Sequence, residues 1–117
     1  MVVVADATAE AIDPDLDEVP GVEVHAFIRS FCEIYTARRH GARYLVTRQK
    51  DVPTIRKLLR VYDRPRLEKM TAVLMMTDDE WIARTDRGIG ILFTKASWLD
   101  AKIAEYEAQH GPIKVAS

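Results

Sequence analysis

The sequence predicts an all-α protein, a compact bundle of four main helices with one short additional helix. Apolar residues recur at spacings of three and four along four segments, and no segment shows the sustained alternation of a β-strand. Asp, Thr, Pro and Gly stand at the segment boundaries, where they begin and end helices. A length of 117 residues with 48% hydrophobic content suits one globular domain.

The first twenty residues differ in composition from the rest of the chain. They contain six acidic residues and no Lys or Arg, and Pro14 and Pro20 interrupt any helix. We therefore expect an acidic disordered tail over residues 1–20 and a single helical domain over residues 21–117.

The first two helices are expected from about Glu23 to Arg39 and from about Arg48 to Tyr62. Gly41 follows the first helix and Thr47 is a suitable N-cap for the second. Pro53 requires the second helix to begin late or to bend. The predicted inward stripes are Val24, Phe27, Ile28, Phe31 and Tyr35, and then Val52, Ile55, Leu59 and Tyr62 with Leu58 beside them.

The later helices have clear local signals at their starts. Asp63 is the expected N-cap of the third helix, with Pro65 in its first turn. Thr77 and Glu80 have the spacing of a capping box, which should open a short helix carrying Trp81 and Ile82. The last helix is expected from about Ile89 to Gln109. Its predicted stripe is Leu92, Phe93, Ala96, Leu99, Ile103 and Tyr106.

The middle of the chain is basic, with twelve Lys or Arg against four acidic residues between Arg29 and Lys69. Four of the cations are spaced by 7, 3 and 4 residues, which places them on one helix face away from the apolar stripe. Such a face suits phosphate binding, although a solvated helix face is the alternative. The candidate nucleic-acid-binding residues are Lys50, Lys57, Arg60 and Arg64, with Arg56, Arg66 and Lys69 widening the patch.

Trp98 falls outside the apolar stripe of the last helix, with Lys95 and Lys102 on its own face. A tryptophan in this setting can stack on a base or anchor a protein partner. The alternative is a ring at the edge of the core that lysine stems cover. We take Trp98, Lys95 and Lys102 as candidate partner-binding residues.

The sequence contains no pattern that predicts catalysis, a metal site or a cofactor site. Consecutive carboxylates at 78–80 point in different directions on a helix, so they suit capping better than chelation. His25, His40 and His110 lack ligand spacing, and Cys32 reads as a small buried hydrophobe. A single cysteine and the absence of a long apolar run lead us to expect a cytoplasmic protein. Because no acid–base pair or metal set can be assembled from these residues, we do not expect an enzyme.

The stretch from Asp51 to Phe93 resembles a helical module of bacteriophage replication initiators and DnaD-like primosome proteins. The resemblance lies in the order of the elements, which are a basic amphipathic helix, an Asp turn, a second helix and an acidic-aromatic turn before the final helix. The segments that carry it are Ile55–Arg60, Tyr62-Asp63, Leu67, Asp78–Ala83 and Ile89–Phe93.

This resemblance implies an all-helical phage domain that contacts DNA or a replication protein. Full-length initiators place a winged-helix domain before the module, whereas this chain has an acidic tail and one helix there. The leading expectation is a phage-type DNA-binding accessory protein of replication that contacts phosphates. The alternative is a small phage protein that inhibits a host nucleic-acid machine such as a CRISPR effector.

Overall fold

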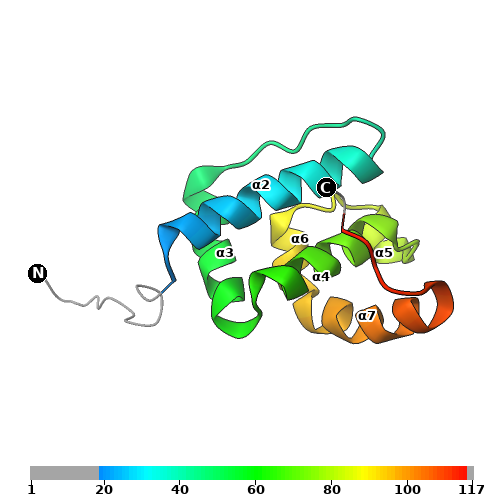
Figure 1. The fold of residues 1–117 in the computed structure, drawn as a ribbon. Coiled ribbons are helices and arrows are strands. Elements are labelled where there is room, and N and C mark those ends of the chain that lie inside the picture. Colours follow the sequence, from blue (N-terminus) through cyan, green and yellow to red (C-terminus); the bar gives the residue numbers. More distant parts are fainter. Residues whose placement is uncertain (1–18, 116–117) are drawn as a thin grey trace, which may run out of the picture.

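The computed structural model describes residues 19–115, and its helices pack around α4 (Figure 1). No strand occurs in this part of the chain. The predicted all-α class is therefore confirmed, with α2, α3, α4 and α7 as the four main helices. In chain order the helices are α2 (Gly21–Arg38), α3 (Arg48–Val61), α4 (Arg64–Met76), α5 (Glu80–Ala83), α6 (Ile89–Thr94) and α7 (Ala96–His110).

Helix α4 lies between α2 and α7, while α3 packs against α2 and α6 (Figure 1). Every residue from Met70 to Met75 is buried, as expected for a helix that is covered on nearly all sides. Phe27 and Phe31 of α2 and Leu99 of α7 are also fully buried in the shared core. Within residues 19–115, none of the helices combines the length and the apolar character that a membrane crossing requires.

The predicted signals at the C-terminal end of α2 and at the start of α4 are confirmed. At the end of α2, His40 takes a left-handed conformation with φ 58°, and the N–H of Gly41 donates to the carbonyl of Thr36 at 2.9 Å. This arrangement satisfies a carbonyl that the helix end leaves open. At the start of α4, a carboxylate oxygen of Asp63 accepts from the N–H of Arg66 at 2.9 Å.

Two expectations about helix starts are corrected. Helix α3 already begins at Arg48 and includes Pro53, so it does not begin late. The N-cap of α5 is Asp79, whose carboxylate accepts from the N–H of Ile82 at 3.1 Å. Thr77 does not cap α5. Its hydroxyl instead accepts a hydrogen bond from the N–H of the N-cap residue Asp79 at 3.2 Å.

The predicted last helix is in fact two helices that meet at Lys95. Lys95 is both the residue after α6 and the residue before α7, and its φ of −105° departs from helical geometry. The turn at Lys95 changes which side chains face inward. Leu92 and Leu99 are buried as predicted, but Phe93 is 45% exposed and is not a core residue.

Tyr44 connects the loop after α2 to two helix starts. Its hydroxyl donates to the Asp51 carboxylate of α3 at 3.3 Å and accepts from the N–H of Ile89 in α6 at 3.2 Å. A Cβ added at Gly88 would lie 2.9 Å from the Tyr44 ring, so this close approach requires glycine. Burial is the main reason why the pKa of Tyr44 rises to about 12.

Arg87 closes the other end of α4. It is buried, and its Nη1 donates to the carbonyls of Leu74 at 3.0 Å, Met75 at 3.1 Å and Thr77 at 2.8 Å. Its φ of 54° is unusual for a residue with a side chain, and the three bonds hold it there. Burial, followed by the charge of Arg39, lowers the pKa of Arg87.

Candidate nucleic-acid interface

Helix α3 has one buried side and one basic side. Its buried residues are Asp51, Ile55 and Leu58, which recur at helical spacing. Four of its five cations lie on the opposite side, where three are exposed and Arg56 is half-buried. We call this surface the α3 basic face and define it as Lys50, Arg56, Lys57 and Arg60.

The segment from Arg39 to Tyr62 supplies no exposed acidic residue of its own. Seven Lys or Arg occur between Arg39 and Tyr62, and Asp51 is the one acidic residue among them. Asp51 is 2% exposed, and its carboxylate accepts from the N–H of Thr47 at 2.9 Å and from the Tyr44 hydroxyl. Because this carboxylate is turned inward and hydrogen-bonded, the segment contributes mainly positive charge to the surface of α3.

No carboxylate among the described residues pairs with Lys50, Arg56 or Lys57. The ammonium of Lys57 instead lies 5.9 Å from the centre of the Phe93 ring. The side chains of these residues therefore keep their charge available to an external anion.

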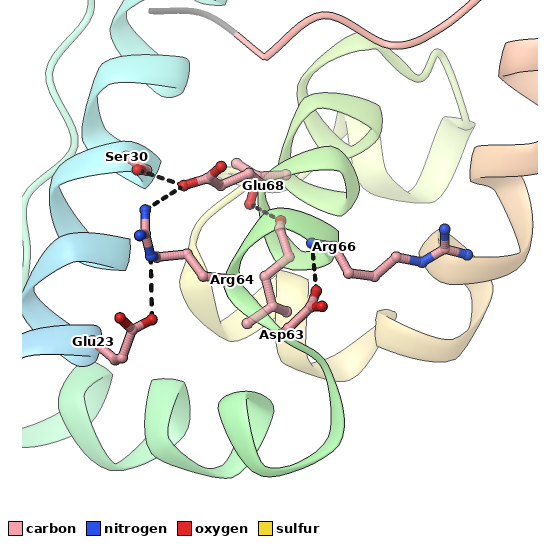
Figure 2. Close-up of polar contacts among 8 residues, drawn as sticks. Glu23, Ser30, Asp63, Arg64, Arg66 and Glu68 are labelled. Carbon is pink, nitrogen blue, oxygen red and sulfur yellow. Dashed lines mark hydrogen bonds and ion pairs between the residues drawn. The ribbon is translucent and has the colours of Figure 1, made fainter. Parts of the chain in front are cut away.

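The three other predicted cations lie on α4 and do not belong to this face. Arg64 Nε lies 3.2 Å from a carboxylate oxygen of Glu23 in α2, and its Nη1 lies 3.3 Å from Glu68 (Figure 2). Ser30 of α2 also donates to Glu68, at 2.8 Å. The hydrogen bond to Glu23 is the main reason why the pKa of Arg64 is raised.

Arg66 and Lys69 connect α4 to α7 in the same way. Arg66 Nε lies 2.5 Å from a carboxylate oxygen of Asp100, and Lys69 Nζ lies 2.9 Å from Glu107. Glu107 also accepts from the N–H of Ile113, at 3.1 Å. The hydrogen bond from Lys69 and then that from Ile113 lower the pKa of Glu107. The predicted continuous stripe is therefore corrected, because its α4 members point toward neighbouring helices.

The predicted cluster around Trp98 is also divided. Lys102 Nζ lies 5.3 Å from the centre of the Trp98 ring and forms an ion pair with Glu105 at 2.6 Å. Lys95 lies over Trp81 instead, at 4.6 Å from the ring centre. Trp98 is half-buried against the core, which matches the alternative of a core-edge ring with a lysine stem over it.

Sequence reasoning missed two surface rings, Trp81 and Phe93. Trp81 is 50% exposed and Phe93 is 45% exposed, and each lies under a lysine ammonium. The position of Trp81 on a one-turn helix that follows a capping residue could have indicated that its ring is exposed. The exposure of Phe93 was hidden, since it depends on the turn at Lys95.

The described residues show no constellation of metal-ligand type, as no three His, Cys, Asp or Glu side chains converge on a common point within 19–115. Cys32 is half-buried in α2, and burial, followed by the charge of Asp51, raises its thiol pKa. A thiol with a raised pKa is a weaker nucleophile at neutral pH.

Comparisons of the chain with protein families, curated proteins and solved structures found no match. The candidate interface is therefore interpreted from its own residues, charges and geometry.

Proposed function

We propose that this protein binds DNA through its phosphates, using the α3 basic face, as an accessory protein of phage-type replication. One observation carries the DNA contact. The α3 basic face is exposed, while the only acidic residue between Arg39 and Tyr62 is buried beneath it. The replication setting rests on the resemblance of the pattern in residues 51–93 to modules of phage replication proteins.

Phosphate contacts explain the side chains of this face better than base readout does. Lysine and arginine on one helix side neutralise phosphates of any sequence, whereas base readout also needs a recognition helix set into a groove, and the sequence shows no recognition-helix motif. Lys50 and Lys57 are two turns apart on α3, a spacing of about 10 Å along the axis. We therefore expect binding that depends strongly on salt and weakly on sequence.

The test is a variant with Lys50→Glu, Lys57→Glu and Arg60→Glu. This variant should not bind duplex DNA even at low salt, where binding by the parent protein is strongest. Single reversals should each lower the slope of log affinity against log salt by about 0.9. The matched control, Arg29→Glu, Arg84→Glu and Lys114→Glu, makes the same charge change at exposed cations outside α3. Equal loss in both triple variants, or a parent protein that never binds DNA, would overturn the proposal.

A second candidate is a protein that binds and inhibits a host nucleic-acid machine such as a CRISPR effector. The half-exposed rings of Trp81 and Phe93 favour it, because aromatic residues commonly anchor protein interfaces. Absence of DNA binding in low salt, together with tight capture of one nucleic-acid-processing protein that Trp81→Ala abolishes, would support this candidate over the first.

A further inference from the structure

Two surface aromatic rings are each paired with a lysine, and one of these lysines, Lys57, belongs to the α3 basic face. Lys57 Nζ lies 5.9 Å from the centre of the Phe93 ring, and Lys95 Nζ lies 4.6 Å from that of Trp81. Both rings are about half-exposed, so each pair leaves ring surface open to solvent. Neither lysine pairs with a carboxylate among the described residues.

These four residues follow one another across three elements of the fold. Lys57 belongs to the α3 basic face and reaches Phe93 at the end of α6. Lys95 follows Phe93 by two residues, at the junction of α6 and α7, and reaches Trp81 of α5. We call the set Lys57, Phe93, Lys95 and Trp81 the ring–lysine band. It joins one pair that begins on the α3 basic face to a second pair at the α6–α7 junction.

We propose that the ring–lysine band binds single-stranded nucleic acid, with phosphates at the two lysines and unpaired bases stacked on the two rings. This proposal rests on the proposed function and names its preferred substrate class. Sites for single strands combine a basic track with aromatic rings, because every unpaired base has a face that can stack. Bases within a duplex are already stacked on each other, so they cannot use Phe93 or Trp81 in this way.

Trp98 provides an internal comparison for this assignment. It also has a lysine over its ring, but Lys102 is neutralised by Glu105 and the ring is half-buried against the core. The Trp98 pair therefore lacks the unpaired charge that a phosphate needs. Trp81 and Phe93 have both an exposed ring and a lysine that pairs with no carboxylate within residues 19–115, which distinguishes them from a ring that merely covers the core.

The central experiment compares a single-stranded oligonucleotide of about 20 nucleotides with a duplex of the same length. The variant carries Trp81→Leu and Phe93→Leu, which keeps apolar side chains at both positions but removes the rings. Its single-strand affinity should fall by roughly tenfold or more for each ring, and its duplex affinity should stay near that of the parent. The control, Val22→Ala and Leu45→Ala, changes two exposed apolar residues and should leave both affinities unchanged.

A second measurement reports on contact with one ring directly. A Trp98→Phe variant leaves Trp81 as the one tryptophan of the chain. Its fluorescence should be quenched on addition of the single strand and much less on addition of the duplex. This readout keeps the test informative if the double leucine variant folds poorly.

The outcomes separate this inference from the proposed function. Equal losses for single strand and duplex in the leucine variant, no loss at all, or unquenched Trp81 fluorescence would each overturn the inference. If the parent still binds DNA and the α3 reversal removes that binding, the proposed function stands even though the inference about the ring–lysine band has failed. A parent that binds neither form of DNA would overturn both, and dependence on Trp81 only for capture of a protein would assign the band to a protein partner.

Discussion

Helices α3 and α4 carry five and three cations, and the two helices use them differently. On α4, Arg64, Arg66 and Lys69 pair with carboxylates that α2 and α7 supply. On α3, Lys50 and Lys57 meet no carboxylate among the described residues, since the one nearby acid is buried.

The difference follows from the position of each helix in the bundle. Helix α4 lies between α2 and α7, so cations at the edges of its buried surface reach acids on either side (Figure 1). Helix α3 packs through one side only and leaves its other side to solvent. A basic helix in a sequence therefore indicates a binding surface only where no neighbouring helix supplies acids. The following predictions test that distinction.

The largest expected effect is on stability. Leu74→Ala in the enclosed α4 should lower the free energy of unfolding by about 2–5 kcal/mol, because it leaves a cavity in a fully buried site. Leu59→Ala in α3 should lower it by roughly half as much, since Leu59 is half-buried. Urea unfolding of both variants measures the difference, and equal losses would contradict the contrast between the two helices.

Removal of the acidic tail should strengthen DNA binding several-fold at low salt. Residues 1–18 lie outside the residues that the structure describes, but they carry six acidic residues and no Lys or Arg. Such a segment competes with phosphates for the α3 basic face. Protein lacking residues 1–18 should also melt close to the parent temperature. Weaker binding by the truncated protein in a salt titration would refute the competition.

Acid pH should weaken the ion pair between Lys69 of α4 and Glu107 of α7 and thereby lower the stability of the fold. The pKa of Glu107 is lowered in the folded protein, so its ionised form stabilises the fold. This contribution is complete above its ordinary pKa of 4.5 and is lost as the pH falls through the lowered folded pKa. Glu107→Gln should therefore lose less melting temperature on acidification than the parent. Asp78→Asn removes an exposed carboxylate and serves as the control; a response equal to that of Glu107→Gln would be evidence against this role of the Lys69 pair.

The smallest expected effect distinguishes one lysine from each helix. Lys69→Met should lower the free energy of unfolding by about 0.2–1 kcal/mol, because a partly exposed ion pair is lost. Lys50→Met should leave stability unchanged or slightly raise it. Lys50 pairs with no carboxylate in the described part of the chain, and it lies in the first turn of α3, where a cation opposes the helix dipole. Thermal unfolding at low and high salt tests the difference, which should shrink as salt screens the pair.

Much of the fold could be predicted because its signals are local. The stripe of Val24, Phe27 and Phe31 predicts the buried side of α2, and Asp63 with Pro65 predicts the start of α4. The turn at Lys95 has no such signal, since neither glycine nor proline stands there. An uninterrupted apolar pattern therefore predicted one helix where the protein has two, and it placed Phe93 in the core.

The candidate site could be predicted only in part. Helical spacing correctly groups Lys50, Lys57 and Arg60 on the outer side of α3. It could not show that Arg64 pairs with a residue 41 positions earlier, or Arg66 with one 34 positions later. Such pairs depend on which helices become neighbours, and the pattern within one helix does not contain that information.

Arg87 makes the end of α4 depend on a residue that comes after α5. Because one guanidinium nitrogen holds three carbonyls of residues 74–77, the last turn of α4 cannot fray without releasing the segment that leads into α6. The two parts should therefore open as one cooperative unit, with similar protection of their amides from hydrogen exchange. Trp81 lies within this unit, so its ring is held on a rigid support even though α5 is a single turn.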